Sequence, residues 1–408
     1  MLKTIENFWI KTSFVNLLIV ALLGVVMRLK IGYEFPYFDQ KNLQYSHYQF
    51  AFGGWVTHIL MVLLVRFISP NLKPARIKIY NILILLNLIC AYGLLLSFAF
   101  QGYNIFSVTF SAFSIFVALA FAYCSFIDLT NPINQKSVAN WFNASLLFSV
   151  ISTFGTVALS YMMISKNIDQ HNYLAAIYWF LHFQYNGWFF FTCGGLFIIY
   201  LKKIAPTFTV SNSVFWLFAV SCIPAYGLSV LWLKLPFWVY LIVLLGAIAQ
   251  AIGWVKLLLD LHSIKLLRNK NLNLLGKILF VAIGLAFTIK LGLQLGSTIP
   301  AVSKLAFGFR PIVIAYLHLV LLAFISVFIV TNLYLNNLIH TNRTTLFGIV
   351  VFVGGVFINE LVLAVQGIAS FSYRVIPYVN SILFFVSIAL FVGIFFLLLG
   401  QFLKNKIV

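Results

Sequence analysis

Long apolar stretches, separated by short polar or basic segments, run through the whole chain. A membrane-crossing helix needs about 20 mostly apolar residues, and twelve stretches meet that length. Their approximate limits are 8–30, 46–67, 77–100, 105–127, 140–164, 173–201, 208–233, 236–261, 274–297, 311–336, 345–369 and 378–403. The segments between them are loop-sized. The pattern therefore predicts an all-α integral membrane protein with a single transmembrane domain over residues 1–408.

Composition supports that fold class and excludes a soluble enzyme. Apolar and aromatic residues make up 63% of the chain and charged residues only 8%, whereas soluble domains have roughly 45–50% and 25%. Lys and Arg number 26 against 7 Asp and Glu, which gives a formal charge of +19. These basic residues stand singly or in pairs between apolar runs, so they form no continuous patch for nucleic acid.

The basic residues also predict an orientation in the membrane. Fourteen of those near span ends fall on one side and eight on the other. Because cytoplasmic loops carry an excess of Lys and Arg, we expect both termini to be cytoplasmic, in a bacterial inner membrane with lipid as the surrounding partner.

Three histidines recur in similar settings along the chain. His47 lies in the sequence YSHYQF, His182 in FLHFQY and His318 in YLHL. Each follows the one before it at a spacing of roughly 135 residues, a fixed period of the kind that marks internal repeats. This spacing equals four spans, so the histidine-bearing spans 2, 6 and 10 would be equivalent members of such a repeat.

The same period recurs on other spans. Tyr92 and Tyr226 each lie in the sequence AYGL, and one further period leads from Tyr226 to Glu360. We therefore predict three four-helix repeats, at about 1–137, 138–272 and 273–408, related by a pseudo-threefold axis along the membrane normal. At a helical rise of about 1.5 Å per residue, the histidines, the tyrosines and Glu360 all fall in the outer half of the bilayer. Such a layer is typical of a buried polar or metal site.

This arrangement resembles subunit I of the haem-copper oxidases, which has twelve helices in three four-helix units and histidines on helices 2, 6 and 10. The resemblance implies that His47 and His318 hold a low-spin haem. It maps His182 onto a histidine that in that family binds copper. Helix count and membrane histidines also resemble the NnrS group, membrane proteins linked to nitric oxide and haem. Both resemblances imply a haem-binding scaffold, and we expect one b-type haem per chain.

Departures from the oxidase pattern limit the activity that the resemblance implies. The oxidases place two adjacent histidines on helix 7, whereas the stretch 208–233 contains none. We therefore expect no copper centre and no reduction of oxygen by this chain alone. The expected role is electron transfer, or a function linked to respiration or nitric oxide, with a redox partner or other membrane subunits.

Further charged and polar residues are candidates for the same site. Arg28 and Arg310, at the outer ends of spans 1 and 10, would meet haem propionates, although arginines at span ends also snorkel to the membrane surface. His58 follows His47 by about three helical turns, on the same helix face but about 16 Å away, so one metal ion cannot bind both. Intramembrane ionisable groups are functional candidates by default.

Glu360 is the carboxylate that the pattern places deepest in a span, and we expect it to handle a proton or contact a ligand. Tyr92 and Tyr226 lie at a comparable depth and join this set. The alternative is that Glu360 pairs with Lys290 and only holds helices together. Lys256 and Asp260, spaced i, i+4, are expected to pair with each other.

Two other functions remain open at this point. The first is a secondary transporter with a midplane site around His182 and Glu360, for which Pro224 supplies a helix break of the kind found in transporters. The second is a subunit of a larger membrane complex that has kept the oxidase-like fold without a cofactor.

Overall fold

The computed structural model describes residues 2–33, 35–129 and 136–403, in which every regular element is a helix. Within these residues, eleven helices are long and apolar enough to cross a membrane, and a bent pair brings the number to twelve if it forms one span. The structure thus supports the prediction of an all-α integral membrane protein. The helices are α1 (Leu2–Gly32), α2 (Gln40–Phe50), η1 (Ala51–Thr57), α3 (His58–Ile68), η2 (Ser69–Asn71), α4 (Pro74–Gln101), α5 (Ile105–Leu129), α6 (Lys136–Ser165), α7 (Gln170–His182), η3 (Phe183–Phe189), α8 (Phe190–Ile204), α9 (Asn212–Cys222), η4 (Pro224–Val230), α10 (Phe237–Ser263), η5 (Leu266–Arg268), α11 (Leu274–Ser297), α12 (Pro300–Gly308), α13 (Arg310–His318), η6 (Leu319–Ser326), α14 (Val327–Leu335), α15 (Arg343–Phe371) and α16 (Val379–Gly400).

Polar side chains begin several of the spans. Asp39 accepts hydrogen bonds from two backbone N–H groups in the first turn of α2, and Asp169 accepts one at the start of α7. Asn273 and Asn342 do the same for α11 and α15. An N-cap of this kind satisfies N–H groups that have no partner inside the helix. These caps fix where the apolar helices begin.

The chain divides into two compact units, residues 1–128 with 333–408, and residues 129–332. The first contains α1 to α5, α15 and α16. The second contains α6 to α13. The two units are groups of residues that pack together, which does not show whether the chain is built from repeats. The three repeats inferred from the sequence therefore stay a prediction.

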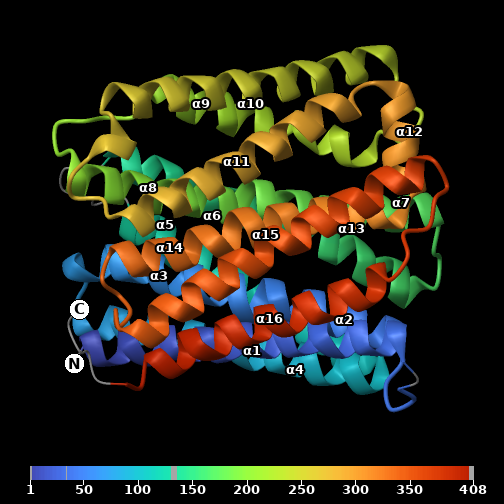
Figure 1. Ribbon diagram of the computed structural model, residues 1–408, viewed down its shortest axis with the longest axis horizontal. Coiled ribbons are helices and arrows are strands. Elements are labelled where there is room, and N and C mark those ends of the chain that lie inside the picture. Colours follow the sequence, from blue (N-terminus) through green and yellow to red (C-terminus); the bar gives the residue numbers. More distant parts are fainter. Residues whose placement is uncertain (1, 34, 130–135, 404–408) are drawn as a thin grey trace. The chain divides into compact units, whose positions relative to one another are not determined.

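In the first unit, α16 packs against both α15 and α1 (Figure 1). Glycines permit the approach of α15 to α16. A Cβ built on Gly393 would lie 2.6 Å from the backbone nitrogen of Phe352, and one on Gly348 would lie 2.5 Å from the nitrogen of Leu397. Such close backbone contact is the usual way that membrane helices associate, because lipid offers no hydrophobic drive between them.

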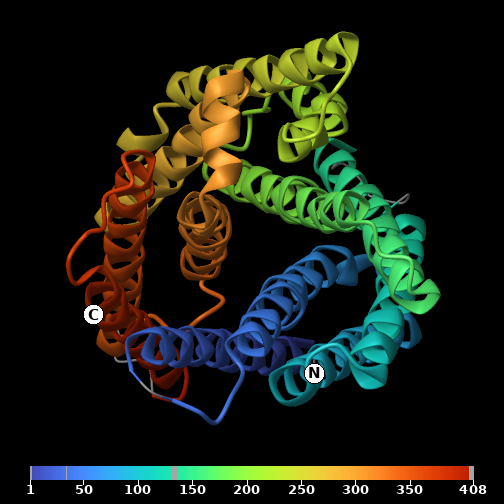
Figure 2. The ribbon, with the colours of Figure 1, turned by 90° about the vertical axis from the view of Figure 1, so that its right-hand side faces the viewer.

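The other part of the first unit surrounds the second span. Helices α1, α2 and α4, coloured dark blue to cyan, are neighbours (Figures 1 and 2), and η1 packs on both α1 and α4. The core here includes Phe50, Ala91 and Leu95. The second span is thus held between the first and the third.

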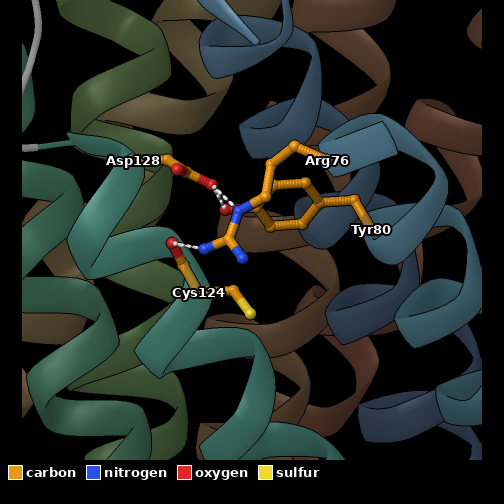
Figure 3. A network of polar contacts seen from close by, with 4 residues as sticks. All are labelled: Arg76, Tyr80, Cys124 and Asp128. Carbon is orange, nitrogen blue, oxygen red and sulfur yellow. Dashed lines mark hydrogen bonds and ion pairs between the residues drawn. The ribbon is translucent and has the colours of Figure 1, made fainter. Parts of the chain in front are cut away.

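A polar network joins the start of α4 to the end of α5 (Figure 3). The Arg76 guanidinium donates from Nε to Oδ2 of Asp128 at 2.8 Å and from Nη2 to the Cys124 carbonyl at 3.2 Å. The Tyr80 hydroxyl donates to the same Asp128 oxygen at 2.5 Å. Three donors from α4 therefore meet acceptors on α5, which locks the register of the two helices.

In the second unit, α6 packs on α7, η3 and α8, and α10 packs on α9 and η4. The sequence predicted one span over 208–233. The structure contains two segments there, α9 and the 3-10 helix η4, bent by 47° at Ile223. Pro224 has no N–H and cannot continue the α-helical bonding.

Candidate functional site

Each of the three histidine-bearing spans contains a π-helical segment. In the second span, η1 begins one turn after His47; in the sixth and tenth spans, η3 and η6 begin directly after His182 and His318. A π segment adds a residue to the helical turn and is frequent at functional sites. We did not predict these segments. The one signal in the sequence is the recurrence of Gly54-Trp55 as Gly187-Trp188, slightly shifted relative to the histidines.

Backbone carbonyls of the π segments bond to polar side chains. In η1, the Gly54 carbonyl accepts from Nδ2 of Asn16 at 2.6 Å, and the Gly53 carbonyl accepts from Nδ2 of Asn87 at 3.1 Å. The Tyr92 hydroxyl then donates to Oδ1 of Asn16 at 2.9 Å. Tyr92, a predicted site residue, therefore braces the Asn16 side chain against η1.

The other two π segments show the same behaviour. In η3, the Asn186 carbonyl accepts from the Cys222 thiol at 3.6 Å. In η6, the Leu321 carbonyl accepts from the Ser326 hydroxyl at 2.8 Å. These bonds give hydrogen-bond partners to buried backbone carbonyls, which would otherwise be costly to bury.

His182 is fully buried in the second unit, and both of its ring nitrogens are bonded. Nε2 lies 2.8 Å from the Cys222 carbonyl, and Nδ1 lies 3.1 Å from Nδ2 of Asn186. A carbonyl only accepts, so Nε2 carries the proton, and Nδ1 accepts from the Asn186 amide. A metal ion could bind His182 only if one of these bonds were broken. Its assignment as a metal ligand stays a prediction.

The bend in the seventh span explains why the Cys222 carbonyl is available. In an α-helix this carbonyl would accept from the N–H of Tyr226, but that N–H instead donates to the Ile223 carbonyl at 3.2 Å. The change from α to 3-10 bonding at Pro224 therefore leaves the Cys222 carbonyl to His182.

Lys290 and Tyr226 complete the surroundings of His182. Lys290 is 4% exposed, and its ammonium lies 5.2 Å from the centre of the Phe287 ring and interacts electrostatically with His182 and Cys222. The Tyr226 ring lies 6.0 Å from the His182 ring, and its hydroxyl donates to the Ala175 carbonyl. We call His182, Cys222, Lys290 and Tyr226 the His182 cluster. The sequence predicted three of its members, although not the electrostatic interaction of Lys290 with His182.

His318 is bonded differently from His182. Its Nδ1 lies 2.9 Å from the Ile314 carbonyl, one turn back on α13. The carbonyl requires a proton on Nδ1, which assigns the lone pair to Nε2. Histidines that bind metal usually donate their other N–H to a carbonyl or carboxylate in this manner. The local chemistry of His318 thus fits an axial ligand.

His47 is half-buried in the first unit and faces α1. A Cβ built on Gly24 would lie 3.7 Å from its Cε1. Arg28 follows Gly24 by one helical turn and so shares that face of α1, whereas Arg310 is exposed at the start of α13. His47 belongs to the first unit and His318 to the second, so their pairing on one haem stays a prediction.

His58 and Glu360 both lie in the first unit. His58 is fully buried, and its ring packs edge-on against Trp9 with 5.5 Å between centroids. Its ring nitrogens make no hydrogen bond of normal geometry to the described residues, although the Trp9 backbone lies close. Glu360 is half-buried, and its Oε1 accepts from Nδ2 of Asn359 at 3.1 Å. Lys290 belongs to the other unit, so its pairing with Glu360 stays a prediction.

Asp260 corrects one expectation. The spacing predicted an ion pair with Lys256, but the carboxylate accepts from the backbone N–H and the hydroxyl of Ser211, at 2.9 and 3.1 Å. The bonds join the end of α10 to the start of α9. Two donors on a neighbouring segment hold this carboxylate better than one flexible lysine at a membrane surface would.

Across residues 2–33, 35–129 and 136–403, no group of three or more His, Cys, Asp or Glu side chains is arranged to hold a metal ion. Haem needs only one or two axial histidines, so this finding does not test a haem site. In comparisons with known proteins, no family model matches the sequence and no curated protein is significantly similar to it.

Proposed function

We propose that this chain is a haem-binding integral membrane protein in which His47 and His318 are the axial ligands. The observation that carries the proposal is the bonding of His318, whose Nδ1–H is held by the Ile314 carbonyl and whose Nε2 carries the lone pair. This is the arrangement that an axial histidine requires. His182 has the other tautomer: its Nε2 donates to the Cys222 carbonyl, and its lone pair, on Nδ1, accepts from the Asn186 amide.

The proposal includes the architecture of haem-copper oxidase subunit I, with three four-helix repeats. Two features support it. Each repeat has a π-helical segment on its second span. In addition, η1 packs on the first and third spans, and η3 packs on the fifth and seventh. The second span of each of these two repeats is thus flanked by the same two neighbours.

A haem held by two histidines has no open coordination position, and so it supplies electron transfer rather than ligand chemistry. Residues of this chain would orient it. Arg28, on the α1 face that meets His47, would neutralise a propionate. Tyr92 and Asn16 would keep the second span in position through their bonds to η1.

The test is an absorption spectrum of protein purified from its native membrane. We expect a Soret band, a narrow reduced α-band and about one haem per chain. His47→Ala and His318→Ala should each abolish the low-spin spectrum, while His182→Ala should leave it intact. His171→Ala is the matched control, because His171, at the start of α7, stacks on Trp232 and is not a proposed ligand.

Native material without haem would overturn the proposal. Loss of the haem in His182→Ala alone would show that the ligands were assigned wrongly.

A second candidate function is favoured by the bent helix pair α9 and η4. Transporters place discontinuous helices at their substrate sites, and here Cys222, next to the break, bonds to the buried His182 and interacts electrostatically with the buried Lys290. If the native protein lacks haem, flux into vesicles measured for the wild type and for Lys290→Met would separate a transporter from a cofactor-free subunit.

A further inference from the structure

The second unit contains a cavity of about 650 Å³, and no residue of the His182 cluster lines it. Side chains of α8, α10 and α11 form its walls, together with Phe324 and Phe328. These walls are apolar and aromatic, with Trp254 and Phe197 among them. The volume lies in the range of about 300–1,000 Å³ that is usual for small-molecule binding sites.

One end of the cavity is basic. His262, Lys265 and Arg268, in the segment where α10 ends and η5 begins, are among its lining residues. Lys265 adopts a left-handed conformation with φ 50°, and its carbonyl accepts from the Arg268 N–H at 2.7 Å. This tight turn lies within the part of the segment that lines the cavity. The acidic residue nearest in sequence, Asp260, is bonded to Ser211 and so does not pair with these cations.

An apolar cavity with cations at one end has the chemistry of an amphiphile site. Basic pockets between membrane helices bind the phosphate head groups of anionic lipids, and Arg in particular forms strong, bidentate bonds to phosphate. We propose that this cavity binds one anionic phospholipid, with an acyl chain between α10 and α11 and its phosphate on Lys265 and Arg268.

The glycine at position 284 offers a way to fill the cavity. A Cβ built on Gly284 would meet only Cζ2 of Trp254, at 4.0 Å, and Gly284 lines the cavity. Gly284→Leu should therefore occupy the space of the acyl chain without displacing protein. Gly292→Leu is the matched control, because nothing lies within 4 Å of that position on the same helix and it is not among the lining residues.

Substitutions that remove positive charge test the contact of the phosphate with Lys265 and Arg268. Lys265→Gln/Arg268→Gln removes two charges from the cavity, while the control Lys270→Gln/Lys277→Gln removes two neighbouring charges that do not line it. Each basic residue near a membrane surface strengthens the binding of anionic lipid, and two together increase the affinity about 30-fold. We expect the Lys265/Arg268 double variant to lose about 30-fold in phospholipid affinity. The Lys270/Lys277 double variant should lose less than about 3-fold, because its side chains would act only through the general surface potential.

The experiment uses protein purified in mild detergent, with bound phospholipid quantified per chain by mass spectrometry. Titration with a phosphatidylglycerol that carries brominated acyl chains then measures affinity through quenching of tryptophan fluorescence, and Trp254→Phe identifies the quenched residue. Wild type and both controls should retain anionic phospholipid, and Gly284→Leu and the Lys265/Arg268 double variant should lose it. Chromatography in detergent verifies that each variant is folded.

Equal retention by all variants would overturn the proposal. So would equal binding of brominated phosphatidylcholine, or loss in Gly284→Leu with no effect of the Lys265/Arg268 variant, since an uncharged amphiphile such as a quinone would then be the occupant.

Discussion

At the scale of single residues, hydrogen bonding distinguishes histidines that the sequence presents as equivalent. His182 and His318 lie one repeat period apart. Nevertheless, His182 uses Nε2 as a donor to a carbonyl on another span, and His318 uses Nδ1 as a donor to its own helix. Only the second arrangement assigns the lone pair to Nε2, the nitrogen that an axial ligand uses when Nδ1 donates. This difference supports the proposal of His318, rather than His182, as a haem ligand.

The Arg76–Asp128 network leads to a prediction about stability. Asp128→Asn would leave Arg76 without its charge partner while Tyr80 keeps an acceptor. The side chains of Arg76 and Asp128 are 27% and 11% exposed, so the loss should lie between that of a surface pair and that of a buried one, at about 2 kcal/mol of unfolding free energy. The unfolding free energies of the wild type and of Asp128→Asn, measured in detergent, give this loss.

The control is the more exposed pair of Arg66 and Glu6. Glu6→Gln should cost less than about 1 kcal/mol. If both substitutions cost the same, the network does not hold α4 to α5.

At the scale of elements, glycines decide how closely two helices approach. Gly348→Ala on α15 would place a methyl group against the backbone of α16, and the helices would have to separate. We expect a loss of about 1–3 kcal/mol in unfolding free energy. Gly354→Ala on the same helix has nothing within 4 Å and should be neutral, or stabilising by up to about 1 kcal/mol. Thermal unfolding of the two variants side by side is the measurement.

At the scale of the whole molecule, the bent pair in the seventh span decides the topology. If α9 and η4 together cross the membrane, the described part of the chain has twelve spans, and the termini are then expected on the same side. Reporter fusions at both termini should then give the same signal, which the distribution of basic residues predicts to be cytoplasmic. Fusions in loops 205–211 and 231–236 should report opposite sides. Termini on opposite sides would show that the pair re-enters instead.

The sequence by itself determined the class of fold and the places of the spans. Apolar length is enough for this, because each membrane helix satisfies its own backbone hydrogen bonds and needs no distant partner. The period that relates His47, His182 and His318 could also be read directly. In the seventh span, Pro224 indicated a break because it lacks an N–H, although the 47° bend that accompanies it could not be read from the sequence.

Only the tertiary structure decided the partners of the buried polar groups. The acceptor for His182 is a carbonyl released by a helix break 40 residues later, and the donors to η1 come from the first and third spans. Asp260 bonds to Ser211, 49 residues away, rather than to the lysine one turn back. Such contacts depend on how helices pack and rotate against one another, which hydrophobic periodicity does not specify when apolar residues surround the helix on all sides.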